Sequence, residues 1–453
     1  MTKKKTALTI EERLQQALVP AEEQPYEVPE NWVWVRLGAI AEIVTGGTPS
    51  KKHPEYYGGN FPFYKPSDLD QGRLTYDASE YLSEEGKNVS RIITKNSTAV
   101  CCIGSIGKCG YLMCEGTTNQ QINSAIPKIN SLCLYYYLCT ENFVQDLLSM
   151  ASATTIAIVN KSKMESCAFP LPPLSEQQRI VERIEELFAK LDEAKERLQE
   201  VADSFAVRKA AILHKAFTGE LTKQWRRENG VSDESWEEKK LGEVGFWLGG
   251  GTPSTSREEY WENGNILWIT SKDMKSAVIE DTLMKVNEIG VKNSSANYIE
   301  KPALLVVMRS GILRRTFPVA MVKKPFTVNQ DLKAIIPDKD DLEFLYWMLL
   351  SNEQRILDTC MKNGTTVESI NSNALKDLTF KCPTLPEQHE NVRLIDDLLA
   401  RERSAQQAAE QALASIDLMK KSILARAFRG ELGTNKASEA SALELLKQVL
   451  AEN

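Results

Sequence analysis

The chain contains one ordered series of motifs twice. The stretch GGTPSKKHPEYYGG begins at Gly46, and GGTPSTSREEYWENG begins at Gly250. Trp32, the pair Asn119-Gln120 and the segment PPLSEQQ have counterparts in the same order in the second half, where ILARAFRGEL answers ILHKAFTGEL. The repeat is far longer than the roughly 20 to 50 residues of solenoid units. It therefore indicates duplication of a whole domain together with the segment that follows it.

The composition is that of a soluble globular protein, with 42% hydrophobic and 26% charged residues among 453. This length predicts roughly two to four domains. No apolar run approaches the roughly 18 residues that span a bilayer, and MTKKKTALTIEER lacks the apolar core of a secretory signal. We expect a cytoplasmic protein without a membrane partner. The nine cysteines lack the density of a disulfide scaffold, so reduced thiols are expected.

The formal net charge of −7 argues against a generally basic protein that binds nucleic acid without sequence preference. The stretches from Val35 to Pro170 and from Lys240 to Lys381 are each about neutral, and the acidic excess lies in the flanking segments. Any binding of DNA must therefore come from the placement of individual charges or from a basic partner.

Two kinds of segment alternate along the chain. The stretches 31–172 and 232–382 mix β-rich apolar runs, turns and short helical patterns, so each is predicted to be an α/β globule. Each globule is followed by a long helix, at 173–222 and 383–433. The predicted fold class is thus α+β, with two globules and two long helices arranged as an internal repeat.

The arm over residues 1–30 has no counterpart in the second repeat. Its segment TIEERLQQALVP is amphipathic but too short to be a stable helix by itself. We expect it to dock on the distal long helix or on a partner protein, and the alternative is an unstructured arm. Residues 434–453 form a C-terminal tail.

The long helices carry apolar residues at the 3.5-residue spacing of a coiled coil. Ser175, with Gln178 three residues later, is predicted to cap the first helix, and Gly219 to end it. Neither apolar seam has another evident partner, which favours pairing of the two helices over packing of each on its own globule. The residues expected to face one another are Leu191, Leu198 and Val201 on the first helix and Ala405, Ala409 and Ala412 on the second.

A variable globule, the helix PPLSEQQRIVERIEELFAKLDEAKERL and the ending AFTGEL, followed by the same series again, form a distinctive combination. It resembles the specificity (S) subunit of type I restriction-modification systems over nearly the whole chain, from Trp32 to Leu432. The motifs PLPPLxEQxxIV and AFxGEL, each present twice in full or degenerate form, carry this resemblance.

The resemblance implies a function and partners. The globules would be target-recognition domains, each reading one part of a split, asymmetric site on double-stranded DNA. The helices would form an antiparallel coiled coil that spaces the globules with pseudo-two-fold symmetry and carries two methyltransferase (M) subunits, and through the complex the restriction (R) subunits. No cofactor is expected in this chain, whereas S-adenosylmethionine would serve M, and ATP and magnesium would serve R.

The hydroxyls and cations of the two Gly-Gly-Thr-Pro-Ser loops are candidates for phosphate contacts. Glycines allow a loop backbone to approach phosphates closely. The alternative is an ordinary tight turn flanked by solvated cations. These candidates are Thr48, Ser50, Lys51, Lys52, Thr252, Ser254 and Arg257.

Amide and threonine pairs recur in both globules. Asn119, Gln120, Asn329 and Gln330 are able to bond adenine, but a feature common to both globules favours a structural or phosphate role. Polar threonine pairs precede the long helices and either contact DNA or cap loops. They are Thr154, Thr155, Thr365 and Thr366.

Residues that differ between the globules are better candidates for reading bases. Arginine paired with guanine is the commonest specific contact, which puts Arg314 and Arg315 first. The other candidates are Tyr64, Lys65, Arg91 and Lys108 in the first globule and Thr270, Lys272 and Arg309 in the second.

Enzyme signatures are missing from the sequence. The segment from Gly104 to Lys108 is too short for a phosphate-binding P-loop, and the three histidines lie far apart in sequence. The cluster Cys101, Cys102, Cys109 and Cys114 lacks the paired spacing of a zinc site, which favours free thiols. We therefore expect a non-catalytic DNA-recognition subunit, with a coiled-coil adaptor that binds only proteins as the alternative.

Overall fold

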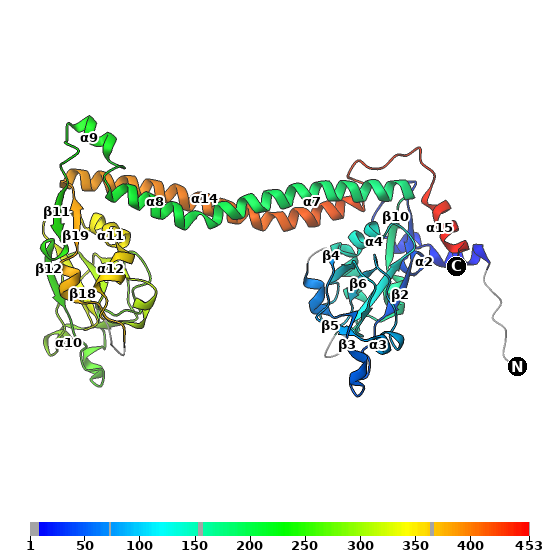
Figure 1. The fold of residues 1–453 in the computed structure, drawn as a ribbon, viewed down its shortest axis with the longest axis horizontal. Coiled ribbons are helices and arrows are strands. Elements are labelled where there is room, and N and C mark those ends of the chain that lie inside the picture. The colour runs from blue at the N-terminus through cyan, green and yellow to red at the C-terminus, as the bar shows by residue number, and fades with distance from the viewer. Residues whose placement is uncertain (1–8, 72–73, 153–156, 363–366, 453) are drawn as a thin grey trace. The chain divides into compact units, whose positions relative to one another are not determined.

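The computed structural model describes residues 9–71, 74–152, 157–362 and 367–452 (Figure 1). The chain divides into two compact units. Unit 1 comprises Met1–Leu198 and Gln411–Asn453, and unit 2 comprises Gln199–Glu410. Each unit thus contains one globule and a part of both long helices.

The globule of unit 1 is built on two sheets and a two-stranded ladder. The strand order of the larger sheet is β2-β9-β6-β7-β4, and that of the smaller is β5-β3-β8, in which β3 and β8 are parallel. The strands are β1 (Val33–Arg36), β2 (Ala41–Thr45), β3 (Tyr57–Tyr64), β4 (Leu74–Thr75), β5 (Glu80–Leu82), β6 (Thr98–Cys101), β7 (Cys109–Leu112), β8 (Thr117–Thr118), β9 (Ile122–Pro127) and β10 (Ala168–Leu171). The ladder pairs β1 with β10, and so joins the two ends of the globule.

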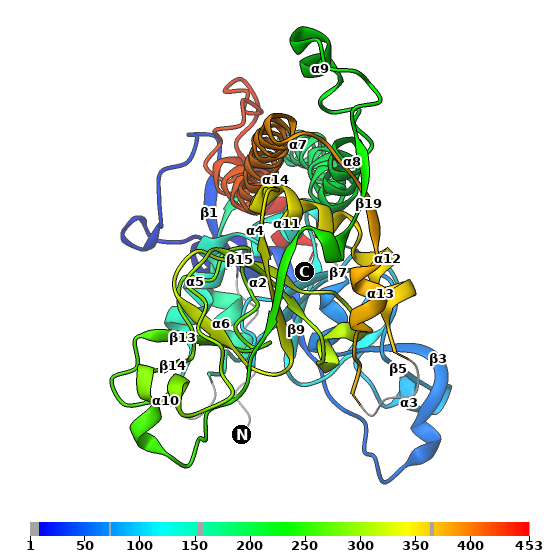
Figure 2. The same ribbon diagram turned by 90° about the vertical axis from the view of Figure 1, so that its left-hand side faces the viewer.

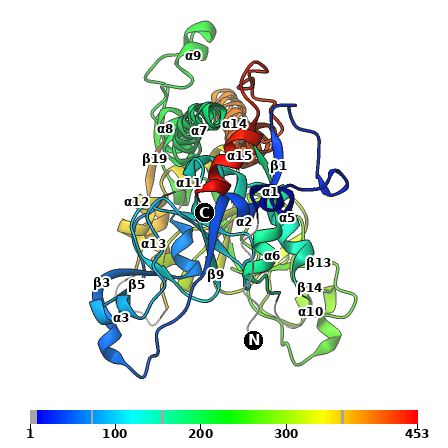
Figure 3. The same cartoon turned by 90° about the vertical axis from the view of Figure 1, so that its right-hand side faces the viewer.

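Helices complete this globule, and Figure 3 shows it from the side of the chain termini. They are α2 (Leu37–Ile40), α3 (Glu84–Asn88), α4 (Ser131–Leu138), α5 (Glu141–Met150) and α6 (Lys161–Ser166). Six consecutive residues of α4, from Cys133 to Leu138, are buried, and α4 belongs to the same core as Ile180 and Ile184 of the first long helix. The three tyrosines of this apolar run therefore pack the globule against the long helices.

The globule of unit 2 repeats this plan (Figure 2). Its sheets have the orders β12-β18-β15-β16 and β14-β13-β17, with β13 and β17 parallel, and β11 pairs with β19. The strands are β11 (Glu237–Lys240), β12 (Gly245–Gly249), β13 (Ile266–Ile269), β14 (Met284–Val286), β15 (Ala303–Val307), β16 (Val319–Val322), β17 (Phe326–Val328), β18 (Leu332–Pro337) and β19 (Thr379–Cys382). The helices are α9 (Lys223–Asn229), α10 (Glu288–Lys292), α11 (Leu342–Ser351), α12 (Glu353–Cys360) and α13 (Ser372–Lys376).

The first predicted long helix consists of α7 (Leu174–Asp203) and α8 (Phe205–Phe217), separated by Ser204 alone, and the second is α14 (Leu385–Ala427). The prediction of Ser175 as N-cap is wrong, because α7 begins one residue earlier. The Pro173 carbonyl accepts hydrogen bonds from the backbone N–H groups of Glu176 and Gln177 at 3.0 Å. Gly219 has a positive φ of 77°, as expected of a residue that ends a helix.

In each unit the start of one long helix lies against the end of the other. In unit 1, Ile180 and Ile184 share a core with Leu424 and Ala427. In unit 2, Leu213 and Ala216 pack with Ile395 and Leu399, and Asn391 Nδ2 donates to the Ala216 carbonyl at 3.0 Å. Both units thus bury an apolar stripe between the two helices.

Two of the residues predicted to lie between the helices do not. Val201 is 40% exposed and Ala405 is also exposed, whereas Ala409 is 3% exposed. Leu191, Leu198 and Ala412 are half-buried. The inward-facing positions of α14 advance from 395 by alternating steps of four and three residues through 399, 402, 406 and 409. The prediction took a three-residue step after 402, which places position 405 on the outer face.

Ala409 provides a test of how tightly the helices pack. We expect Ala409→Leu to lower the free energy of unfolding by about 1 to 3 kcal/mol, because added methylene groups do not fit at a closed position. Ala405→Leu, the same change on the outer face, should stay within about 0.5 kcal/mol of wild type. Urea unfolding of the purified chain measures both, and equal effects would contradict close packing at position 409.

The N-terminal arm docks within unit 1. Helix α1 (Ile10–Ala17) contacts α15 (Ala442–Ala451) of the C-terminal tail (Figure 3). Arg13 Nη1 donates to the Leu450 carbonyl at 3.2 Å, and Val19 N–H donates to the Trp34 carbonyl at 3.0 Å. The arm therefore packs on the first globule and the tail helix. It also contacts the end of the predicted distal segment, where the Arg429 guanidinium lies 5.3 Å from the centre of the Tyr26 ring and Ala17 shares a core with Leu424 and Phe428, so that part of the prediction is confirmed. Docking on a partner protein stays a prediction.

Candidate nucleic-acid interface

In each globule the two parallel strands of the smaller sheet end side by side. Tyr64 pairs with Thr118 at the ends of β3 and β8, and Asn119 N–H donates to the Tyr64 carbonyl at 3.1 Å. In unit 2, Ile269 pairs with Val328, and Asn329 N–H donates to the Ile269 carbonyl at 3.0 Å. The carboxyl edge of parallel strands is where α/β folds usually bind ligands. We call this place, with the residues that follow each strand, the strand-end edge.

The Gly-Gly-Thr-Pro-Ser loop lies on the strand-end edge. Gly47 N–H donates to the Thr118 carbonyl at 2.8 Å. A Cβ atom on Gly46 would lie 2.2 Å from the Asn119 carbonyl oxygen, and one on Gly250 would lie 1.8 Å from that of Val328. No side chain fits at these distances. The first glycine of each loop is therefore required by a close approach to the chain's own backbone, and not by approach to a phosphate.

A hydrogen bond joins the two repeated motifs in each globule. The Thr48 hydroxyl donates to Gln120 Oε1 at 2.6 Å, and the Thr252 hydroxyl donates to Gln330 Oε1 at 2.8 Å. We call these pairs the latches. All four residues are exposed. Motifs that are far apart in the sequence thus form one surface feature, which is present once in each unit.

The asparagine before each latch glutamine makes hydrogen bonds within its own turn. Asn119 is buried, its Nδ2 donates to Gln121 Oε1 at 3.0 Å, and its Oδ1 accepts from the Gln121 N–H at 3.1 Å. Asn329 makes the equivalent bonds with Asp331 at 3.2 and 3.1 Å. These geometries favour the structural interpretation for both asparagines, which leaves Gln120 and Gln330 as the amides on the surface.

The turn after the first parallel strand carries different side chains in the two globules. Asp68 accepts the Lys65 N–H at 2.7 Å, and Asp273 accepts the Thr270 N–H at 2.9 Å, so Lys65 and Thr270 occupy equivalent positions. Lys65 forms an ion pair with Glu80 at 2.7 Å. In unit 2 the cation of this turn is Lys272, two residues further along and exposed. The same scaffold thus presents a positive charge at different places.

Tyr64 is not available to DNA. Its side chain is fully buried, and its hydroxyl donates to the Tyr76 carbonyl at 3.4 Å. Burial raises the pKa of Tyr64, so the phenol stays neutral. The prediction that Tyr64 reads bases is wrong, because the last residue of β3 points into the core, as its equivalent Ile269 does.

The other candidates in the first globule lie mostly on the surface. Arg91 is exposed, and its Nη1 donates to the Thr45 carbonyl at 2.5 Å, directly before the glycine pair. Lys108 forms an ion pair with Asp70 at 2.5 Å. Ser50, Lys51 and Lys52 are exposed. The loop and Arg91 therefore place positive charge beside the latch of unit 1.

In the second globule, Ser254 and Arg257 are exposed, and Arg257 Nη1 donates to the Tyr260 hydroxyl at 2.9 Å. Arg309 N–H donates to the Asp331 carbonyl at 3.2 Å, which places Arg309 next to the Asn329 turn. The guanidinium of Arg314 is paired with Glu368 and lowers the pKa of that carboxyl group. Arg315 is exposed. The four threonines predicted beside the long helices, Thr154, Thr155, Thr365 and Thr366, lie outside the described residues.

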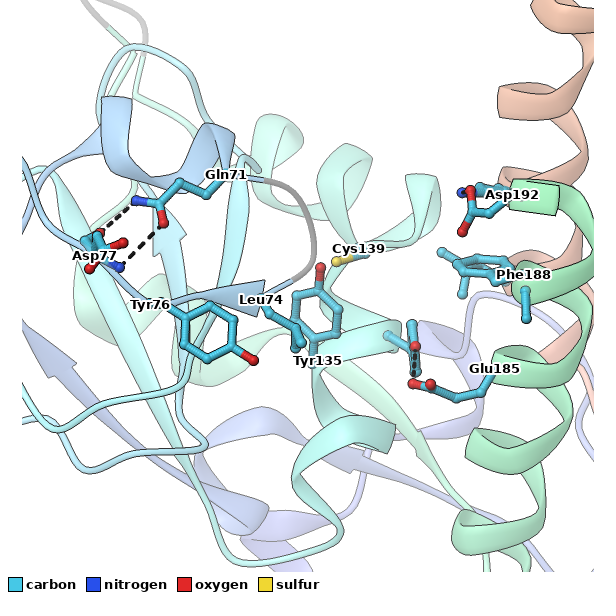
Figure 4. A pocket seen from close by; sticks show the side chains of 13 residues that line it. Gln71, Leu74, Tyr76, Asp77, Tyr135, Cys139, Glu185, Phe188 and Asp192 are labelled. Carbon is cyan, nitrogen blue, oxygen red and sulfur yellow. Dashed lines mark hydrogen bonds and ion pairs between the residues drawn. The ribbon is translucent and has the colours of Figure 1, made fainter. Parts of the chain in front are cut away.

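Unit 1 contains a cavity of about 710 Å³ next to the long helices, which no sequence pattern predicted (Figure 4). Tyr135, Phe188 and Asp192 line it. The ammonium group of Lys420 lies 5.2 Å from the centre of the Phe188 ring and 2.5 Å from Asp192. Tyr136 and Glu185 also line the cavity, and the Tyr136 hydroxyl donates to Glu185 Oε1 at 2.5 Å. The cavity wall thus contains contacts that hold the globule on the helices.

Two of the four clustered cysteines are buried thiols, whereas Cys109 is partly buried and Cys114 is exposed. Cys101 and Cys102 are buried, and burial raises the pKa of Cys102 to about 12. Among the described residues, no group of three His, Cys, Asp or Glu side chains is placed to hold a metal ion. In the same part of the chain, no helix is both long and apolar enough to cross a bilayer.

Comparisons with known proteins identify the family. The family model of the type I restriction modification DNA specificity domain matches residues 29–203 and 233–412. The specificity subunit of type I restriction enzyme EcoR124I/EcoR124II from Escherichia coli is 37% identical over 196 residues, which are 42% of this chain and 48% of that protein. The EcoBI specificity subunit from E. coli is 24% identical over 467 residues, covering 94% of this chain and 93% of that protein.

A solved structure shares the fold. The crystal structure of the HsdS subunit from Thermoanaerobacter tengcongensis matches with a TM-score of 0.64 and 18% identity, over 90% of this chain and 99% of that one. The duplicated globule and long helix, and the two matches to one domain model, agree with each other. The chain therefore belongs to the family of DNA specificity subunits of type I restriction-modification systems.

Proposed function

We propose that this chain is a non-catalytic subunit that recognises a bipartite, asymmetric site on double-stranded DNA, with one half-site read by each globule. One observation carries the proposal. The same strand-end edge with its latch occurs in both globules, but the side chains of the adjoining turn differ, with Lys65 in one and Thr270 and Lys272 in the other. A common scaffold with different surface residues is suited to reading two different short sequences.

The long helices are proposed to form an antiparallel coiled coil that sets the spacing of the two half-sites. The packing of helix starts against helix ends in each unit supports this arrangement. Ion pairs flank the apolar stripe, as Arg208 with Glu402 at 2.5 Å in unit 2 and Lys420 with Asp192 at 2.5 Å in unit 1. Such pairs contribute to register more than to stability.

Two methyltransferase subunits are proposed to dock on these helices. Val207 of α8 is 71% exposed and Leu418 of α14 is 67% exposed, and each lies at the same place before the phenylalanine of an AFxGEL motif. An exposed apolar residue at matching positions supports two equivalent docking sites. The restriction subunits would join through the complex. S-adenosylmethionine would be bound by the methyltransferase, and ATP and magnesium by the restriction subunit.

We expect Val207→Glu and Leu418→Glu each to remove one of two bound methyltransferase subunits, and the double variant to remove both. A charge buried without a partner at an interface should weaken docking by roughly tenfold or more. Gln411→Glu, at an exposed polar position of α14, is the matched control and should assemble normally. Native mass spectrometry of the co-expressed complex counts the subunits, and full assembly of the double variant would contradict these docking sites.

Methylome sequencing of a host with and without this gene, expressed together with its methyltransferase, tests the proposed function. The expected result is one split motif that is methylated only when the gene is present. Selection from randomised duplexes by the purified complex should enrich the same motif. Assembly with the methyltransferase but no enrichment of any sequence would favour the adaptor that binds only proteins.

A further inference from the structure

The latches leave one side of each glutamine available to a ligand. In both globules Gln Oε1 accepts from the threonine hydroxyl, so the bond fixes the orientation of the side-chain amide. Among the described residues, no hydrogen bond occupies the Nε2 groups of Gln120 and Gln330. Each exposed amide therefore presents two N–H donors and calls for a ligand that offers acceptor oxygens or nitrogens.

A cation lies at the start of the same loop in both globules, although different elements supply it. In unit 1, Arg91 donates to the carbonyl of Thr45, the residue directly before the glycine pair. In unit 2 the equivalent residue is Gly249, and a Cβ atom on it would lie 2.6 Å from the ammonium nitrogen of Lys333 on β18. Two unrelated side chains thus bring positive charge to one place, which indicates an anionic ligand.

We propose that each latch and its neighbouring cation form a contact for a phosphate of the DNA backbone, and that this contact is the same in both half-sites. The inference rests on the proposed function. The amide nitrogen of Gln120 or Gln330 donates to a phosphate oxygen, while Arg91 or Lys333 supplies charge. Hydrogen bonds to phosphate fix the orientation of a protein on the duplex and carry no sequence information. That role suits a feature shared by globules whose half-sites differ.

Two other roles for the latches give different expectations. If Gln120 read a base, its removal would relax the motif at one position of one half-site. If the latch only fastened the loop, any side chain that accepts the threonine hydrogen bond would be equivalent. Glutamate distinguishes these cases, because it keeps an acceptor for Thr48 and replaces the outward donors with negative charge.

The experiment compares Gln120→Ala, Gln120→Glu, Gln330→Ala and Gln330→Glu in the complex with the methyltransferase. Gln145→Ala on α5 and Gln354→Ala on α12 are exposed matched controls. The probes are duplexes that carry the motif found by methylome sequencing, the same duplexes with one base changed in each half, and a scrambled duplex. The dissociation constant of every pair is measured at one fixed salt concentration.

We expect each alanine variant to weaken binding to all duplexes by about tenfold, because a hydrogen bond to a charged acceptor is lost. The glutamate variants should be weaker still, because a carboxylate repels phosphate. The ratios among the duplexes and the methylated motif should stay as in wild type, and the controls should bind normally.

A motif that changes at one position would overturn the phosphate contact in favour of base reading. Glutamate variants that bind DNA like wild type would overturn the phosphate contact and show that the latch only holds the loop in place. A wild-type complex that selects no sequence would instead contradict the proposed function, so the two failures are distinguishable.

Discussion

Replacing Glu387 with glutamine is expected to lower the free energy of unfolding by about 3 to 5 kcal/mol, because it removes the buried carboxylate that pairs with the buried cation of Arg226. Glu387 is fully buried and accepts hydrogen bonds from three residues of unit 2. Arg226 Nη1 and the Thr222 hydroxyl lie 2.6 Å from its Oε1 atom, and Trp236 Nε1 lies 2.8 Å from it. Arg226 is itself only 5% exposed, so water cannot replace the lost carboxylate.

The charges in this cluster depend on each other. Burial opposes the charge of Arg226, but hydrogen bonds and charge interactions with Glu387 and Asp233 outweigh it, so the pKa of Arg226 is raised. The guanidinium group therefore stays charged when residue 387 becomes neutral. It keeps only Asp233 as an ion-pair partner, at 3.1 Å and with an exposed carboxylate. The expected loss comes from this weaker compensation of the buried charge and not from a change in volume, since glutamine has nearly the size of glutamate.

Unit 1 provides the matched control. Glu176 is also fully buried, but it accepts from neutral groups, which are Trp32 Nε1 at 2.7 Å, the Thr434 hydroxyl at 3.2 Å and Asn435 Nδ2 at 2.8 Å. Glu176→Gln leaves one buried donor without an acceptor but leaves no cation without its carboxylate. We therefore expect the free energy of unfolding to fall by about 1 to 3 kcal/mol. Thermal and urea unfolding of the three purified chains measure the difference. Equal losses would show that the charge of Arg226 is not what makes Glu387 important.

These two clusters explain why the motifs at the helix starts and ends recur together. In each unit, a threonine that follows an AFxGEL ending donates to the glutamate at the start of the other repeat's long helix, and that repeat's tryptophan donates to the same glutamate. The donors are Thr222 and Trp236 for Glu387, and Thr434 and Trp32 for Glu176. The sequence contained every one of these residues in duplicate. It did not predict that they meet, because hydrogen bonds between segments so far apart have no periodic signature.

The elements that could be predicted are those with local or repeated signatures. The internal repeat predicted two similar globules, and the 3.5-residue apolar spacing predicted helices as long as α14, of 43 residues. The helix begins with hydrogen bonds to the Pro173 carbonyl and not with the expected cap at Ser175. The reason is that Glu176, the residue after Ser175, accepts a buried hydrogen bond from Trp32. Local capping rules are weaker than such a tertiary contact.

The candidate interface was predictable in composition and less so in detail. Both loops and both amide pairs were chosen from the repeat, and the latch between Thr48 and Gln120 joins them. Tyr64 was predicted to read bases because it differs between the two globules. Core residues also differ between them, and Tyr64 and Ile269 are buried at equivalent core positions. Lys333 was missed because it belongs to a strand, and only the pairing of β12 with β18 brings it to the loop.

Exchanging residues 237–382 for the same segment of another family member is expected to change one half of the methylated motif completely and leave the other half as in wild type. The boundaries follow the structure. Glu237 pairs with Cys382 at the end of the β11–β19 ladder, so the ladder moves as a whole. Trp236 and Glu387 stay in place, which retains the cluster that attaches the globule to the long helices.

The matched exchange replaces residues 33–171 of unit 1. Val33 pairs with Leu171 in the β1–β10 ladder, and Trp32 and Glu176 remain. It should change the opposite half of the motif, and methylome sequencing of hosts that carry each chimera with the methyltransferase reads both outcomes. The number of bases between the halves should be unaltered, because both chimeras keep the original long helices. A single exchange that altered both halves would show that the globules read DNA jointly and would contradict the assignment of one half-site to each.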